Sequence, residues 1–206
     1  MRAARRIGLF GGSFNPPHLA HLALARVARD ALQLDELRWI PAGDPWQKPA
    51  SELAPAKDRA AMVSLLIEGE PGFVLDRIEL ERVGPSYSID TVRALQARET
   101  SPSGAEWFLI IGQDQYRRID TWRDAAQLRV LVCFAVAARG GESPRPPDAW
   151  AGQIHHRVVL PLARTDLSAT EIRQRAAAGQ PVSPLVGEAV ARYIEQHRLY
   201  RVPPGL

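Results

Sequence analysis

Short apolar segments alternate with longer amphipathic segments along most of this chain. The apolar segments are rich in β-branched and aromatic residues, which favours strands. Strands are expected at residues 5–10, 36–40, 73–82, 106–112, 129–138 and 156–162. Helices are expected at 15–32, 57–69, 114–128, 168–179 and 183–200, and a loop feeding another helix covers 83–99. This alternation predicts an α/β protein with a doubly wound, mostly parallel sheet and helices on both faces.

Capping and turn residues place several boundaries of these elements. Asn15 is expected to cap the helix at 15–32, with Pro16 in its first helical position, and Ser88 to cap the helix within 83–99. Residues 41–56 are rich in proline and lack periodicity. Loops of this length are more often functional or mobile than simple connections.

Composition and charge are those of an ordinary globular protein. The chain has 206 residues, 46% of them hydrophobic and 24% charged, so one domain with a sizeable core is expected. The net charge is +3, without long runs of like charge or basic residues interleaved with aromatic ones. A nucleic-acid partner is therefore not expected.

The apolar runs and the single cysteine bear on the compartment. The longest uncharged apolar run, residues 130–138, is far too short to span a bilayer. The basic N-terminus is followed by too short an apolar segment for a signal peptide. Cys133 has no partner for a disulfide within the chain, which suits a reducing compartment. We therefore expect a cytoplasmic protein with no membrane partner.

The segment GLFGGSFNPPHLAHL, residues 8–22, combines the features of a phosphate site. Gly11, Gly12 and Ser13 follow a predicted strand and precede a helix, so backbone amides can approach an anion at the helix N-terminus. His18 and His21 share one face of that helix and can donate hydrogen bonds to phosphoryl oxygens. We expect both imidazoles to face solvent in the empty protein.

Other interpretations of this segment are weaker. Its spacing matches neither the dinucleotide-binding glycine fingerprint nor the P-loop. A tight turn with two exposed histidines is the structural alternative. A metal site built on His18 and His21 lacks a nearby cysteine or carboxylate ligand, so no metal bound by the chain itself is expected.

The segment resembles the G-[GT]-[ST]-F-[DN]-P-x-H-x-G-H signature of the nucleotidyltransferase superfamily. Further motifs occur in the order found in bacterial nicotinate-nucleotide adenylyltransferases, so the resemblance covers essentially the whole chain. These motifs are QKP at 47–49, GPSYSIDT at 84–91, IIGQDQYRRIDTW at 110–122, DLSATEIR at 166–173 and YIEQHRLY at 193–200.

The resemblance implies a Rossmann-like fold and a reaction. Members of this family transfer AMP from ATP to nicotinate mononucleotide, giving deamido-NAD and pyrophosphate, with Mg²⁺ bound along with ATP. A single nucleotidyltransferase domain over 1–206 is then expected, with a C-terminal helical part, about 163–206, packed on it. A homo-oligomer stays possible.

The resemblance also assigns site residues. Gly11, Gly12, Ser13, Phe14, His18 and His21 would line the nucleotide phosphates, together with Ser168, Thr170 and Arg173 at the start of another helix. Trp122 would stack on the nicotinate ring, and backbone amides around Tyr87 and Ser88 would bind its carboxylate. Catalysis would rest on His18, His21, Lys48 and Arg173 without a protein nucleophile.

Several of these residues also have structural interpretations. Ser168 and Glu171 form a capping-box pattern, and Trp122 suits a core position. Lys48 lies in the long proline-rich loop, where a flexible cation could close over phosphate. Gly112 permits close approach of a ligand and Asp114 can accept from ribose hydroxyls, although Asp114 could equally be an N-cap.

The chain departs from the family pattern at three positions. Ala20 stands in place of a glycine, Asn15 where many members have aspartate, and Ala169 in place of a serine. Two alternatives therefore stay open: a sister adenylyltransferase acting on nicotinamide mononucleotide or another phosphate acceptor, and a nucleotide-binding module without turnover.

Overall fold

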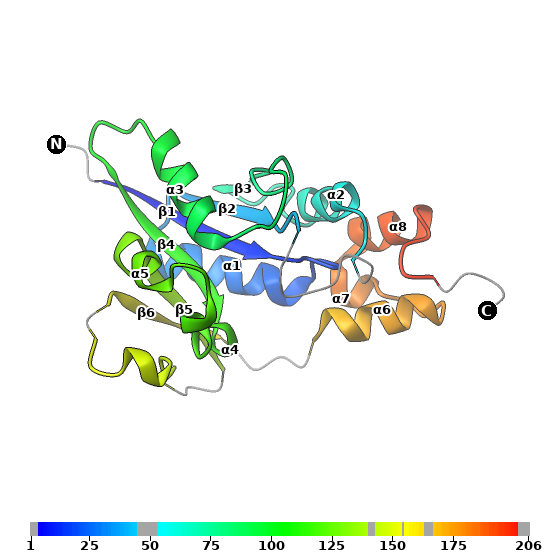
Figure 1. The fold of residues 1–206 in the computed structure, drawn as a ribbon. Coiled ribbons are helices and arrows are strands. Elements are labelled where there is room, and N and C mark those ends of the chain that lie inside the picture. Colours follow the sequence, from blue (N-terminus) through cyan, green and yellow to red (C-terminus); the bar gives the residue numbers. More distant parts are fainter. Residues whose placement is uncertain (1–3, 45–52, 140–142, 154, 163–166, 202–206) are drawn as a thin grey trace.

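A six-stranded parallel sheet forms the centre of the molecule (Figure 1). The computed structural model describes residues 4–44, 53–139, 143–153, 155–162 and 167–201. The strands are β1 (Arg5–Gly12), β2 (Glu36–Pro41), β3 (Phe73–Leu75), β4 (Ala105–Gly112), β5 (Cys133–Arg139) and β6 (Arg157–Leu162), in the order β3-β2-β1-β4-β5-β6. This order confirms the doubly wound sheet that the hydrophobic pattern predicts and the Rossmann-like fold that the family resemblance implies.

Helices connect the strands and extend beyond the last one. They are α1 (Leu19–Leu32), α2 (Ala56–Leu66), α3 (Ser88–Arg98), α4 (Gln113–Tyr116), α5 (Ala125–Leu131), α6 (Ala169–Ala177), α7 (Ser183–Val186) and α8 (Glu188–Gln196). Short 3₁₀ turns, η2 (Ile119–Thr121) and η3 (Asp148–Trp150), interrupt two of the connections. No helix in the described part of the chain is long and apolar enough to cross a membrane.

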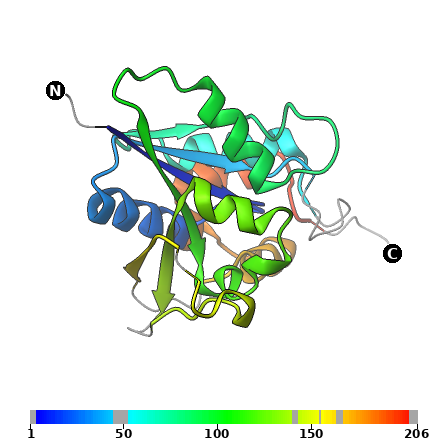
Figure 2. The same cartoon turned by 60° about the vertical axis from the view of Figure 1, so that its left-hand side comes forward.

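Two apolar cores cover the two faces of the sheet. Along β1, Ile7 and Leu9 belong to the core formed with α3 and α5, whereas Phe10 belongs to the core formed with α1 and α2. This alternation follows from the two-residue period of a strand. Figure 2 shows α1 and α3 on opposite sides of the strands.

The C-terminal helices share the core of the α1 face. Ile172 of α6, Val186 of α7 and Ile194 of α8 are buried in the same cluster as Phe10 and Leu22. Figure 1 shows these helices beside α2, at the end of the molecule toward which β1 points. Ligands of doubly wound sheets bind at that carboxyl edge, next to the point where the strand order reverses.

The first helix begins later than the sequence predicts. It starts at Leu19 with His18 as the N-cap residue, so Asn15 is not the cap and Pro16 is not its first residue. A residue before proline is disfavoured in the α conformation, and Pro17 places that restriction on Pro16. The Asn15–Pro16 peptide is cis.

Other boundaries also differ from the expected ones. Ser88 is the first residue of α3 rather than its cap. The strand expected at 73–82 ends at Leu75, because the Asp76 side chain accepts a hydrogen bond from the Ile78 amide (3.0 Å) and turns the chain. The helix expected at 183–200 is divided at Gly187, whose φ is 83°.

The segment before β5 is the least accurately predicted. The helix expected over 114–128 is three short pieces, and the strand expected at 129–138 begins only at Cys133. Residues 129–131 belong to α5 instead. Asp124 has a φ of 50°, which starts α5 as a separate helix.

Candidate active site

A cavity of about 270 Å³ opens at the carboxyl ends of β1 and β4, where the strand order reverses. Its volume is near the lower end for small-molecule pockets. Residues from three separate sequence motifs, those at 8–22, 84–91 and 110–122, line it. They include seven of the predicted site residues: Gly11, Gly12, Ser13, Tyr87, Ser88, Gly112 and Trp122.

Two glycines leave open space beside this cavity. A Cβ atom placed on Gly11 or on Gly112 would meet no atom within 4 Å. Both positions line the cavity, one at the end of β1 and the other at the end of β4. The backbone at both strand ends is therefore accessible to a bound molecule, as expected for these glycines.

The N-terminus of α3 forms another part of the cavity wall. Tyr87 is its N-cap residue and Ser88 its first helical residue. The first amides of a helix have no intrahelical acceptor and carry the positive end of the helix dipole, so they favour an anion. The Arg123 guanidinium lies 4.8 Å from the centre of the Tyr87 ring and adds a positive charge here.

Trp122 and Glu79 complete the wall. Trp122 is half-buried: it packs against the core on the α3 face, as its structural interpretation predicts, and it also lines the cavity, while its stacking on a nicotinate ring stays a prediction. Glu79 was not among the expected residues, because it lies in a segment predicted to be a strand. It is 9% exposed and accepts a 2.8 Å hydrogen bond from the Thr91 hydroxyl. Burial raises the pKa of this carboxyl.

His18 is buried, contrary to the expectation that it faces solvent. It is only 6% exposed, because it is the N-cap of α1 and the chain before it folds inward through two prolines. Burial lowers the pKa of His18 to about 4, so its imidazole is neutral near pH 7. Its Nδ1 atom has no hydrogen-bond partner within the described residues. A buried nitrogen of this kind could hydrogen-bond to a bound ligand.

His21 lies directly against His18. The backbone amide of His18 donates a 3.2 Å hydrogen bond to Nδ1 of His21, and the ring centres are 3.6 Å apart. The Phe14 ring meets His21 edge-on at 5.2 Å. Phe14 is itself buried, and it packs on Trp39 at 5.3 Å. Phe14 therefore supports the histidine pair from the core and is not open to a ligand.

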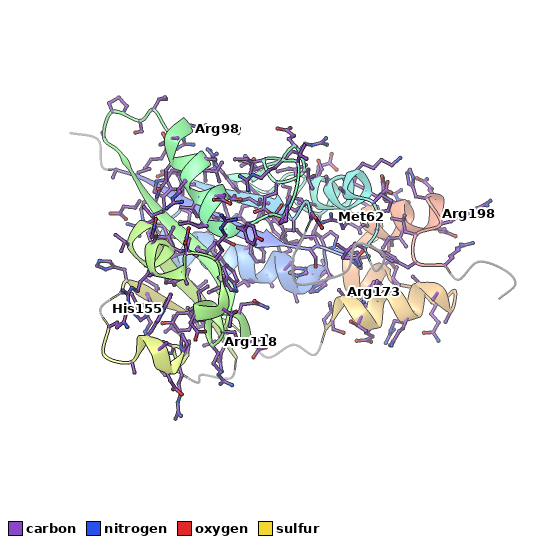
Figure 3. All side chains as sticks on the ribbon, in the orientation of Figure 1. Met62, Arg98, Arg118, His155, Arg173 and Arg198 are labelled. Atoms are coloured by element: carbon purple, nitrogen blue, oxygen red, sulfur yellow. The ribbon has the colours of Figure 1, made fainter. Side chains whose placement is uncertain are left out.

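Arg173 extends from α6 to the same motif. Its Nη1 donates to the carbonyl oxygen of Asn15 (2.9 Å), and its Nη2 lies 3.4 Å from the Thr170 hydroxyl. Ser168 caps α6 by accepting from the Glu171 amide (3.2 Å), as the capping pattern predicts. Figure 3 shows Arg173 among the C-terminal helices, at the end of the molecule opposite His155.

Asn15 connects several segments instead of capping α1. It is 3% exposed, and its Oδ1 accepts hydrogen bonds from the Ala54 amide and the Tyr200 hydroxyl, both 3.0 Å long. With the bond from Arg173, three distant parts of the chain meet at this residue. A capping asparagine would instead bond its own helix.

Arg59 of α2 is a further residue that the sequence analysis missed. It is 1% exposed and donates to the carbonyl oxygens of Ser13 (2.8 Å), Ala42 (2.7 Å) and Ala54 (3.0 Å). These bonds join the end of β1 to the end of β2 and to the start of α2. The available signal was its spacing, since Arg59, Val63 and Leu66 lie on one face of the helix.

Seven other predicted site residues do not line the cavity: Phe14, His18, His21, Asp114, Ser168, Thr170 and Arg173. Asp114 is exposed on α4 and does not line the cavity, although it follows Gly112 closely. Its contact with ribose stays a prediction. Lys48 lies outside the described residues.

Among the residues described here, no group of three or more His, Cys, Asp or Glu side chains could hold a metal ion. Mg²⁺ prefers oxygen ligands and commonly binds through substrate phosphates while keeping several waters. Phosphate oxygens of a nucleotide held beside the histidine pair would meet that requirement.

Comparisons with known proteins identify the family of this chain. The sequence profile of the cytidylyltransferase-like family matches residues 9–175. A curated relative from Methylibium petroleiphilum, named "Probable nicotinate-nucleotide adenylyltransferase", is 50% identical over 205 residues, which are 98% of this chain and 95% of that protein. A relative of the same name from Bordetella pertussis is 44% identical over 95% of this chain and 98% of that protein.

A solved structure shares the fold. The Plasmodium falciparum nicotinic acid mononucleotide adenylyltransferase complexed with NaAD superimposes with a TM-score of 0.72, covering 95% of this chain and 97% of that one. The two sequences are 17% identical, so this likeness concerns the fold.

Proposed function

Because the chain belongs to the cytidylyltransferase-like family, we propose that it joins AMP from ATP to nicotinate mononucleotide, forming deamido-NAD and pyrophosphate. One observation carries the proposal. The end of β1, the N-terminus of α3 and Trp122 surround one cavity at the sheet reversal, and the histidine pair follows directly in the chain. The names of the closely similar relatives support the same reaction.

The chemistry needs no nucleophile from the protein. An oxygen of the mononucleotide phosphate attacks the α-phosphorus of ATP, and the bond from that phosphorus to the bridging oxygen of the β-phosphate breaks. Pyrophosphate leaves with the electron pair of that bond. The protein has to align the two phosphates and stabilise the charge that develops on the leaving group.

We propose that the histidine pair and Arg173 bind the phosphates. A phosphate beside His18 would supply the counter-charge that this buried imidazole lacks, and would raise its pKa from about 4. Arg173 keeps donors beyond the one bound to Asn15 for a phosphoryl oxygen. We propose that Lys48 adds a second cation. Mg²⁺ bound with ATP would neutralise part of the phosphate charge.

The cavity is suited to the pyridine ring of the acceptor. The flat face of Trp122 offers a stacking surface, and the first amides of α3 can bind a carboxylate with both of its oxygens. A carboxamide would present its NH₂ group to one of these donors. Discrimination between acid and amide therefore depends on Tyr87, Ser88 and their backbone.

We also propose that the protein works in the cytoplasm. Cys133 is a free, half-buried thiol, which suits a reducing compartment. ATP and nicotinate mononucleotide are both charged small molecules, so they would reach this site from solution.

Pyrophosphate release tests the proposed function. Purified protein is incubated with ATP and Mg²⁺, with and without nicotinate mononucleotide. Release that depends on the mononucleotide supports the proposal. Release of pyrophosphate without any acceptor, or no release with it, would contradict the proposal.

A further inference from the structure

The two tyrosines of the C-terminal segment YIEQHRLY each bond a distant part of the chain. The Tyr193 hydroxyl donates to Oδ1 of Asp58 on α2, at 2.9 Å, and the Tyr200 hydroxyl donates to Oδ1 of Asn15, at 3.0 Å. The first bond joins two helices. The second reaches the turn between Ser13 and His18, inside the phosphate-binding motif.

Asn15 contacts Arg173 as well as Tyr200. Its Oδ1 accepts one other described hydrogen bond, from the Ala54 amide, and its carbonyl oxygen accepts from Nη1 of Arg173 at 2.9 Å. With Asn15 only 3% exposed, water cannot readily replace a lost donor. Bonds to the side chain of Asn15 restrain the residue whose backbone carbonyl oxygen holds the Arg173 guanidinium.

We propose that Tyr200 is a positioning residue of the triphosphate site, acting through Asn15 on Arg173. This inference rests on the proposed role of Arg173 in binding the phosphates of ATP. Tyr200 itself contacts no substrate. Its hydroxyl and the Ala54 amide both donate to Oδ1 of Asn15, so the two bonds together restrain the orientation of this side chain.

The surroundings of Tyr200 keep its hydroxyl a donor. Burial raises the pKa of this phenol, and the positive charges of Arg173 and Arg59 only partly oppose the effect. The phenol is therefore protonated throughout the physiological range. A phenylalanine would keep the aromatic packing and remove only the donor.

Binding of ATP in the absence of any acceptor tests the inference. Calorimetric titration of Tyr200→Phe with MgATP is expected to show a dissociation constant roughly 3- to 10-fold above that of the unchanged protein, the effect of one lost hydrogen bond. Tyr193→Phe is the matched control, because it removes the same group from the same segment but leaves Asn15 untouched. It should bind MgATP as the unchanged protein does.

A double-mutant cycle separates positioning from general destabilisation. Arg173→Met weakens MgATP binding, and adding Tyr200→Phe to it should change the constant by less than about twofold, because the residue through which Tyr200 acts is gone. Asn15→Ala should weaken MgATP binding as much as Tyr200→Phe does. Adding Tyr200→Phe to Asn15→Ala should then not change the dissociation constant further. Asn15→Ala serves as the second variant if Tyr200→Phe folds poorly.

Equal weakening by both tyrosine variants, or additive effects of Tyr200→Phe and Arg173→Met, would overturn the inference. These titrations contain no mononucleotide, so they test the ATP side alone. If the protein bound MgATP and showed this coupling but transferred nothing to nicotinate mononucleotide, the proposed function would fail while the inference stood.

Discussion

The backbone amide of His18 donates a hydrogen bond to Nδ1 of His21, and the two imidazole rings stack with their centres 3.6 Å apart. An Nδ1 atom that accepts a hydrogen bond carries no proton, so His21 is neutral in this arrangement, with its proton on Nε2. His18 is neutral as well, since burial lowers its pKa to about 4. Two positive rings at this distance would repel each other.

Substitutions of His21 should separate its capping role from its role in turnover. Asparagine can accept from the His18 amide as Nδ1 does, whereas alanine cannot. We expect His21→Ala to lower the free energy of unfolding by about 1 kcal/mol. His21→Asn should retain most of this stabilisation. Turnover should fall on the order of a hundredfold in both, because both lose the Nε2 donor.

Urea unfolding and steady-state rates measure these two effects. The unchanged protein is the reference for each. Near-normal turnover in His21→Asn would remove His21 from the phosphate site.

The pH dependence of stability should report the burial of His18. Its pKa is lowered from 6.5 to about 4 in the folded state, so the unfolded chain binds more protons between these values and stability falls as the pH falls through this window. From pH 7.5 to pH 5 the loss due to His18 should be about 2 kcal/mol. The variant His18→Gln should not show this contribution to the pH-dependent loss of stability.

Denaturant titrations at the two pH values measure the difference. Other groups titrate equally in both proteins, so they cancel when the two losses are subtracted. Losses of equal size in the unchanged protein and in His18→Gln would contradict the assigned pKa.

Arg173 should act on ATP more than on the acceptor. Replacing it with methionine removes a charge beside the Asn15 turn and should raise the KM for ATP on the order of tenfold, with little change for the mononucleotide. Arg175 is the control, because it lies on the same helix and pairs with Glu171 instead. Arg175→Met should leave both constants unchanged. If only the KM for the mononucleotide changed, Arg173 would bind the mononucleotide and not ATP, which would contradict this prediction.

Arg59 should be important for stability. It donates to three segments with almost no exposure, so Arg59→Met would leave the Ser13, Ala42 and Ala54 carbonyls without this donor. We expect a loss of about 3 kcal/mol or more in the free energy of unfolding. Lys57→Met, on the exposed side of α2, should change it by less than about 0.5 kcal/mol. Similar values for both variants would contradict the role given to Arg59.

The sheet and its carboxyl edge could be predicted because they depend on apolar periodicity. Buried strands such as β4 and β5 read as continuous apolar runs between helices, and parallel strands bring Gly11 and Gly112 to one edge. The helix after β1 was placed too early because capping preferences are local, whereas Asn15 is held by Ala54, Arg173 and Tyr200.

The site was predicted in part from local motifs. Gly11 and Gly12 follow a predicted strand, whereas Tyr87, before α3, and Trp122, after η2, were assigned from the resemblance to family motifs. The burial of His18 and the bonds of Arg59 depend on contacts between segments far apart in the chain, and no local pattern records those contacts.

The most direct measurement compares product formation from the two mononucleotides. Nicotinate mononucleotide carries a carboxylate where nicotinamide mononucleotide carries a carboxamide, and the two are otherwise identical. The NH₂ group of the carboxamide would face the backbone N–H donors of α3. An unpaired buried polar group costs roughly 1–3 kcal/mol, and the loss of a charge-assisted bond adds to this. With ATP and Mg²⁺, kcat/KM for deamido-NAD formation should exceed that for NAD formation by about a hundredfold. Comparable values for the two would contradict a nicotinate-specific site, and the absence of both products would contradict adenylyl transfer itself.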